Sequence, residues 1–317
     1  MTEKKNIFLF PGQGAQRKGM GIDLFDAADE AKKLCGCAAE IMNTDIRKLL
    51  AEADDETLKR SDIAQPAITL VNLSAACILK SRGVIPSACA GHSLGEYAAL
   101  ALCGIITAED SLRLTARRGE LMRQAALAAG GGMAAVMGLA PEVVEKAVSE
   151  WTNAGLKDLY IANYNSPRQI VISGSAAALN EAETRFKEKR FVETGIRRVI
   201  KLAVAGPFHS PLMKEAADKF AATLETVKFS NPVIPFFSNV TGKQVMSGEE
   251  AKTLALRQIC GAVRWLDEET AISAMKPDAI LELGPGKTLC GLWKDTGSAI
   301  PCHPAGTIED IDKINAA

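Results

Sequence analysis

The chain has 317 residues, too many for one small module, and this length suits two domains or one large α/β domain with an insert. Hydrophobic residues make up 47% and aromatic residues only 5%, so we expect a sizeable and mostly aliphatic core. Lys and Arg number 37 against 38 Asp and Glu, a net charge of −1 without a long block of one sign. This balance argues against nucleic acid as the main partner.

Several features favour a cytoplasmic protein with no membrane segment, metal or cofactor. The apolar run Ile7–Phe10 is too short for the hydrophobic region of a signal peptide, and longer apolar stretches such as 97–106 fall below the roughly 18 residues of a membrane span. The eight cysteines include no CxxC pair, and the three histidines (His92, His209 and His303) have no second ligand at metal spacing. We therefore expect reduced cysteines, no disulfide framework and no zinc.

The first 130 residues alternate between short apolar runs and longer segments with helical spacing. The predicted strands are Ile7–Phe10 and 87–91, and the predicted helices are 64–80, 96–103 and one that starts after Thr107. Pro66 is expected in the first turn of its helix, where proline is tolerated. Asp110, three residues after Thr107, completes a start resembling a capping box. This alternation predicts an α/β fold with a mainly parallel sheet.

After Gly130-Gly131-Gly132 the pattern changes. The predicted strands are 133–139, 160–163, 169–173 and 198–204, and the predicted helices are 141–151 and 176–189. The resulting order β-α-β-β-α-β is that of a ferredoxin-like unit. We therefore predict a ferredoxin-like subdomain over 131–203, inserted into one large α/β catalytic domain formed by 1–130 and 204–317.

The segment Gly91-His92-Ser93-Leu94-Gly95 fits the G-x-S-x-G turn that carries a serine nucleophile. Its glycines allow a sharp turn between strand and helix, which lifts the serine hydroxyl above the sheet and turns the Leu94 N–H toward a developing oxyanion. The alternative is an inactive Gly/Ser turn. A preceding apolar run and a following Ala/Leu-rich helix favour the nucleophile.

A serine nucleophile needs a base, and elimination among the histidines favours His209. His92 adjoins the serine and should point away from it, and His303 could be a surface loop residue. His209 lies in a Pro-flanked loop directly after a predicted strand, where the sites of α/β sheets assemble. A packing or capping role for His209 is the alternative. Because no Asp or Glu presents itself as a third member, a backbone carbonyl or an amide is expected to orient the imidazole.

Two neighbouring arginines have opposite predicted environments. Helical spacing places Arg117 on a polar face and Arg118 in register with Leu114 and Leu121, on the core side. A buried arginine needs an anionic partner, which is either a buried Asp or Glu or a carboxylate on the substrate. The glycine-flanked Gln13 could supply a second oxyanion N–H, although the tripeptide taken alone favours a plain glycine turn.

Six motifs in order resemble the malonyl-CoA:acyl carrier protein transacylases and the acyltransferase domains of fatty-acid and polyketide synthases, over nearly the whole chain. They are Phe10–Gly14, Gly91–Glu96, Arg118-Gly119, Asn163–Gly174, Gly206–Pro211 and Glu282–Gly286. The resemblance implies a hydrolase-like α/β domain with a ferredoxin-like insert. It also implies malonyl transfer from malonyl-CoA to the phosphopantetheine thiol of acyl carrier protein, through a malonyl-serine, for fatty-acid synthesis.

The resemblance also implies roles for individual residues. Ser93 would be the nucleophile, His209 the general base, and the backbone N–H groups of Gln13 and Leu94 the oxyanion hole. Four further positions are implied: Arg118 on the malonyl carboxylate, Gln258 orienting the histidine through its carbonyl, and Gln65 and Asn163 lining the pocket. Phe208 resembles malonyl-selective members.

Two other functions use the same residues. A serine hydrolase needs the serine and its base but no fixed cation in the acyl pocket, so Arg118 separates it from a malonyl transferase. A non-catalytic thioester-binding protein needs neither Ser93 nor His209 as reactive groups. The absence of a sustained heptad or apolar stripe favours a monomer, and the insert cations Lys187, Lys189, Arg190, Arg197 and Arg198 are candidates for receiving an acidic carrier protein.

Overall fold

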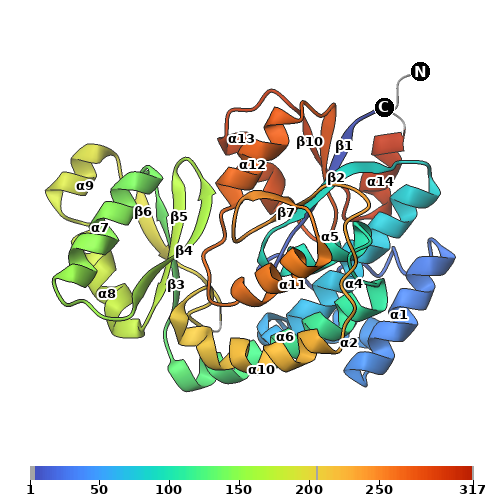
Figure 1. The fold of residues 1–317 in the computed structure, drawn as a ribbon, viewed down its shortest axis with the longest axis horizontal. Helices are drawn as coiled ribbons and strands as arrows, with labels where there is room; N and C mark the ends of the chain where they lie inside the picture. The colour runs from blue at the N-terminus through green and yellow to red at the C-terminus, as the bar shows by residue number, and fades with distance from the viewer. Residues whose placement is uncertain (1–3, 205, 316–317) are drawn as a thin grey trace.

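The computed structural model describes residues 4–204 and 206–315. Residues 1–3, 205 and 316–317, which belong to the predicted large domain, lie outside the described residues. Two sheets organise the chain: a six-stranded sheet surrounded by most of the helices, and a four-stranded sheet at the left of Figure 1.

The larger sheet is mainly parallel, as predicted. Its strand order is β10-β9-β1-β2-β7-β8, and only the β7–β8 pair is antiparallel. The bounds are β1 Asn6–Phe10, β2 Pro86–Gly91, β7 Phe236–Ser238, β8 Lys243–Val245, β9 Ala279–Glu282 and β10 Cys302–Pro304. The parallel strands β10, β9, β1, β2 and β7 bring their carboxyl ends to one edge of the sheet, where α/β proteins place their sites.

Alternate residues of the central strand β1 face two different groups of helices. Phe8 and Phe10 pack in the core formed with α4, α5 and α6, whereas Ile7 and Leu9 pack with α12 and α13. The helices of this domain are α1 Asp29–Met42, α2 Ile46–Glu52, α3 Asp55–Lys59, α4 Ser61–Ser81, α5 Glu96–Leu102, α6 Ala108–Ala129, α10 Lys214–Glu225, α11 Gly248–Arg257, α12 Trp265–Ala274, α13 Thr288–Asp295 and α14 Ile308–Asn315.

Helix α4 corrects two predictions. It begins at Ser61, so Pro66 lies inside the helix and not in its first turn. It is also long and apolar enough to span a membrane, contrary to our expectation that the apolar stretches fall short of that length. Because 83% of its most apolar 18-residue window is buried inside the protein, α4 is a core helix.

The smaller sheet is antiparallel throughout, with the order β4-β5-β3-β6 that a β-α-β-β-α-β unit forms. Its elements are β3 Gly132–Met137, α7 Pro141–Asn153, β4 Leu159–Ser166, β5 Gln169–Gly174, α8 Ala176–Arg185, α9 Lys189–Thr194 and β6 Arg198–Lys201. The predicted helix 176–189 ends early, at Arg185, and α9 begins only at Lys189. The C-cap residue Phe186 packs there against Trp151 and Phe191. The predicted strand 198–204 ends early, at Lys201.

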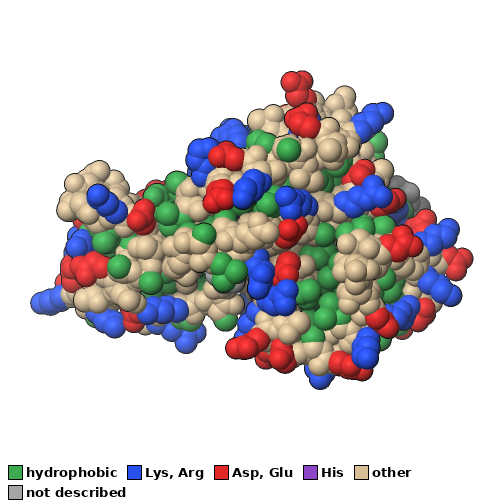
Figure 2. Space-filling view, turned by 90° about the horizontal axis from the view of Figure 1, so that it is seen from below, with side chains coloured by type: hydrophobic (Ala, Val, Ile, Leu, Met, Phe, Trp, Pro, Cys, Tyr) green, Lys and Arg blue, Asp and Glu red, His purple; other side chains and the backbone are tan. Residues whose placement is uncertain are grey.

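The structure pairs Cys290 with Cys302 as a disulfide between α13 and β10. The prediction that all cysteines are reduced is wrong for these two, because the fold brings their Cα atoms to 5.3 Å, a separation that suits a disulfide. On the face seen in Figure 2, basic and acidic side chains are interspersed, in line with the net charge of −1.

Candidate active site

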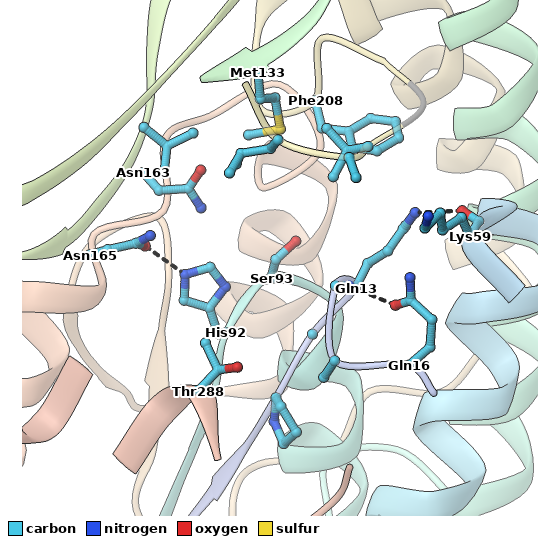
Figure 3. Close-up of a pocket in the computed structure, with 18 of the residues that line it drawn as sticks. Gln13, Gln16, Lys59, His92, Ser93, Met133, Asn163, Asn165, Phe208 and Thr288 are labelled. Atoms are coloured by element: carbon cyan, nitrogen blue, oxygen red, sulfur yellow. Dashed lines mark hydrogen bonds between the residues drawn. The ribbon is translucent and has the colours of Figure 1, made fainter. Parts of the chain in front are cut away.

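A cavity of about 860 Å³ lies between the two sheets, at the carboxyl ends of β1 and β2. The large domain contributes Gln13, Ser93, Arg118 and His209 to its lining, and the β4 strand of the small sheet contributes Asn163. In Figure 3 the Ser93 hydroxyl points into this space, with Asn163 on one side and Gln13 on the other. The cavity thus gathers six of the eight predicted site residues from segments far apart in the chain, whereas Leu94 and Gln258 are not among its lining residues.

The turn after β2 holds Ser93 in a left-handed backbone conformation, with φ of 51°. A side chain on either flanking glycine would collide with backbone. A Cβ on Gly91 would lie 2.1 Å from the Gly95 carbonyl carbon, and one on Gly95 would lie 1.9 Å from the Phe10 carbonyl oxygen. The close packing therefore requires glycine at both positions. The strained Ser93 begins a short 3₁₀ turn, Ser93–Gly95, which leads directly into α5.

His209 is oriented by two backbone carbonyls and contacts the serine. Its Nε2 lies 2.7 Å from Ser93 Oγ, and its Nδ1 lies 3.0 Å from the Gln258 carbonyl oxygen and 3.1 Å from that of Gly261. Since carbonyls only accept, Nδ1 carries the proton and the Nε2 lone pair faces the serine. Burial, with a smaller effect of the Arg118 cation, lowers the pKa of His209 to about 3. The imidazole is therefore a neutral base near pH 7.

The Gly261 carbonyl could not be identified from the sequence. A carbonyl is present at every residue, so only the chain path after α11 reveals which ones converge on the imidazole. No carboxylate of the described residues contacts His209, in agreement with the missing acid of the sequence.

The backbone N–H groups of Gln13 and Leu94 belong to the loop after β1 and to the serine turn. Among the described residues, neither the Gln13 nor the Leu94 N–H donates to a protein acceptor. A Cβ on Gly12 would lie 2.4 Å from the His92 carbonyl oxygen and 3.4 Å from the Leu94 nitrogen, so the loop after β1 rests directly on the serine turn. The two N–H groups thus belong to loops that touch each other beside the serine.

Arg118 is buried beside the serine, as its helical register predicts, and is 1% exposed. Its guanidinium donates to Gln65 Oε1 at 2.8 Å and Gln258 Oε1 at 3.0 Å, and its Nη2 lies 3.4 Å from Ser93 Oγ. No ion pair joins it to a carboxylate within residues 4–204 and 206–315. Arg117, by contrast, is exposed and paired with Glu120.

A glycine explains how the guanidinium reaches Gln65. A Cβ on Gly119 would lie 2.2 Å from the Ser61 carbonyl oxygen, so α6 can approach the start of α4 this closely only with glycine there. The close approach brings Arg118 of α6 next to Gln65 of α4.

The remaining predicted residues occupy distinct places. Gln65 and Asn163 both line the cavity, and Gln65 is buried beside Arg118. His92 points away from the serine, as expected, to the Asn165 Oδ1 at 2.8 Å. His303 is exposed, although it lies in β10 and not in a loop. Phe208 is nearly buried in the cavity wall, near Met133 in Figure 3.

The geometry places a serine beside a neutral imidazole, two N–H groups without a partner among the described residues, and a buried cation that none of the described carboxylates contacts. These groups suit acyl transfer to and from a serine on an acyl group that carries a negative charge.

Known proteins share both the sequence and the fold. The family described as "Acyl transferase domain" matches residues 7–312. The malonyl CoA-acyl carrier protein transacylase of Bacillus subtilis is 37% identical over 97% of this chain and 95% of its own length. The polyketide biosynthesis malonyl CoA-acyl carrier protein transacylase PksC of the same organism is 40% identical over 90% of this chain and 94% of its own. The crystal structure of MCAT from Streptococcus pneumoniae superposes with a TM-score of 0.90 at 33% identity, covering 98% and 99% of the two chains.

Proposed function

The chain belongs to the acyl transferase family, and from this premise we propose that it is an acyl carrier protein S-malonyltransferase of fatty-acid synthesis. It moves the malonyl group of malonyl-CoA to the phosphopantetheine thiol of acyl carrier protein. The reaction passes through a malonyl ester of Ser93.

The observation that carries this proposal is the unpaired guanidinium of Arg118. A buried cation is costly unless an anion is near. Glu96 acts on this cation only at a distance, and none of the described carboxylates contacts the guanidinium. Its Nη2 lies 3.4 Å from Ser93 Oγ, so an anion bound there sits close to the acyl carbon attached to the serine. Malonyl has its carboxylate at this short distance from the thioester carbonyl.

The first half-reaction acylates the serine. Ser93 Oγ attacks the thioester carbonyl while His209 Nε2 takes the hydroxyl proton, and the Gln13 and Leu94 N–H groups donate to the oxyanion. Collapse of the tetrahedral intermediate breaks the C–S bond. The CoA thiolate leaves with the proton from His209, and the malonyl-serine remains.

The second half-reaction reverses these roles. The carrier thiol gives its proton to His209 and attacks the ester, and the same two N–H groups hold the new oxyanion. The C–Oγ bond then breaks, and Ser93 regains its proton from His209.

In the insert, Lys187, Lys189 and Arg190 form ion pairs with glutamates, whereas Arg197 and Arg198 form none within the described residues. We therefore assign the carrier contact to Arg197 and Arg198.

A steady-state experiment tests the proposal against hydrolysis. With malonyl-CoA and phosphopantetheinylated carrier protein both varied, we expect parallel lines in double-reciprocal plots and malonyl-carrier as the main product. Converging lines would contradict a covalent intermediate with two half-reactions. Release of free malonate at the same rate with and without the carrier would instead establish a hydrolase.

A further inference from the structure

Asn239 directly follows β7 and is fully buried behind the catalytic turn. Its Oδ1 accepts from the Ser93 N–H at 2.7 Å and from Gln258 Nε2 at 3.2 Å. Its Nδ2 donates to the Gly91 carbonyl at 2.8 Å and to Glu268 Oε1 at 2.7 Å. Both donors and both acceptor sites of this amide are thus used, which fixes its orientation.

Two of these bonds hold the strained turn from either side. Gly91 ends β2, and Ser93, two residues later, has φ of 51°. The asparagine amide bridges the carbonyl before the bend and the N–H within it. A left-handed residue other than glycine persists only where its surroundings hold it, and Asn239 supplies that restraint.

The bond to Gln258 extends the restraint to the oxyanion hole. Gln258 Nε2 donates to the Ser93 carbonyl at 2.9 Å as well as to Asn239. The Ser93 carbonyl and the Leu94 N–H belong to one planar peptide, so fixing the carbonyl also fixes the direction of the N–H. The Gln258 amide therefore aims the Leu94 donor, and Asn239 determines which way that amide faces.

The same orientation serves Arg118. With Nε2 toward Asn239, the Gln258 Oε1 is turned to accept from Arg118 Nη2 at 3.0 Å. A reversed amide would face the guanidinium with N–H groups. One buried asparagine thereby holds the backbone of the serine turn and, through Gln258, fixes the direction of the Leu94 N–H and the position of the Arg118 guanidinium.

We propose that Asn239 is a positioning residue of the acyl transfer reaction, acting on the Ser93 turn directly and on Leu94 and Arg118 through the Gln258 side chain. The inference rests on the proposed function of Ser93, Leu94 and Arg118. It assigns to Gln258 a side-chain role distinct from its backbone carbonyl, which accepts from His209.

The first test compares Asn239→Ala with Ser238→Ala. Ser238 is equally buried at the same strand end, but among the described residues its hydroxyl accepts only from the Val240 N–H, at 3.3 Å. We expect Asn239→Ala to lower kcat by about 10- to 100-fold with KM for malonyl-CoA changed less than about threefold, since complete loss of one oxyanion donor costs about 10²–10³. Ser238→Ala should stay within about twofold of the wild type. A kcat loss no larger than that of Ser238→Ala, or a loss confined to KM, overturns the proposal.

A double-mutant cycle separates positioning from general destabilisation. Gln258→Met removes the amide but keeps the length and the backbone carbonyl. If Asn239 acts through Gln258, the kcat of the double variant Asn239→Ala/Gln258→Met should be no more than about threefold below that of the slower single variant. If the fold-decrease in kcat of the double variant equals the product of the two single decreases, the two residues act independently, and action of Asn239 through Gln258 is refuted. Thermal midpoints and active-site titration correct each rate for the folded fraction.

A covalent probe keeps this result independent of malonyl transfer. A fluorophosphonate reacts with an activated serine and places its phosphoryl oxygen where the oxyanion forms, without acyl-CoA or carrier. Labelling of Asn239→Ala should slow by about the same factor as kcat, whereas unchanged labelling overturns the inference. A wild-type protein that labels normally but forms no malonyl-serine would instead refute the proposed function.

Discussion

Replacing Arg118 by alanine should remove the preference for a charged acyl group. The guanidinium is buried and has no protein carboxylate in contact with it in the described chain, so malonyl would be its anionic partner. Truncating one member of a buried, hydrogen-bonded charge pair costs about 2–5 kcal/mol. At about 1.4 kcal/mol per tenfold, kcat/KM for malonyl-CoA should fall about 30- to 4000-fold.

The assay is competition between malonyl-CoA and an uncharged acyl-CoA of similar size, followed by mass spectrometry of the acylated carrier. The uncharged group should gain relative to malonyl, because it never made the ion pair. Arg117→Ala is the matched control, since Arg117 is the adjacent residue of the same helix but is exposed and paired with Glu120. Unchanged selectivity in Arg118→Ala, or an equal change in Arg117→Ala, would refute the role assigned to Arg118.

Two further predictions concern the base and the helix contact. The pKa of His209 is about 3 in the folded protein and about 6.5 in an unfolded chain, so unfolded molecules bind more protons between these values and stability falls as pH drops below about 6.5. The wild type should lose unfolding free energy between about pH 6 and pH 5 in urea unfolding, and His209→Gln should lose up to about 1.4 kcal/mol less over the same interval. If both proteins show the same dependence of unfolding free energy on pH, a neutral buried imidazole is contradicted. Gly119→Ala places a Cβ 2.2 Å from the Ser61 carbonyl oxygen and should cost about 1–3 kcal/mol of stability together with malonyl transfer. Gly36→Ala in α1, where a Cβ meets no atom within 4 Å, should leave transfer unchanged and raise stability by about 1 kcal/mol, and equal effects of the two substitutions would contradict the contact.

The parts of the site that local sequence determines were predictable. The glycine-flanked turn at Ser93 follows from five consecutive residues, and the burial of Arg118 follows from its spacing to Leu114 and Leu121 on one helix. The mainly parallel sheet followed equally from the alternation of apolar runs and helical segments. Each of these features depends on residues close together in the sequence, where the spacing of apolar residues directly indicates the local structure.

The rest depends on which distant segments meet. Asn239 lies 146 residues from Ser93, and nothing near it in sequence distinguishes it from a turn residue. The end of α8 at Arg185 also coincides with contacts between distant residues, since the C-cap Phe186 packs with Trp151 of α7 and Phe191 of α9. Our assignment of 131–203 as the inserted subdomain stays a prediction in its boundaries.

The intact mass of the protein tests the central claim most directly. After brief incubation with malonyl-CoA, we predict a gain of one malonyl group, located on Ser93 by peptide mapping and absent from Ser93→Ala. Adding phosphopantetheinylated carrier protein should then discharge that group onto the carrier thiol. Full transfer by Ser93→Ala, or a wild-type protein that supports transfer without ever gaining a malonyl group, would contradict the account.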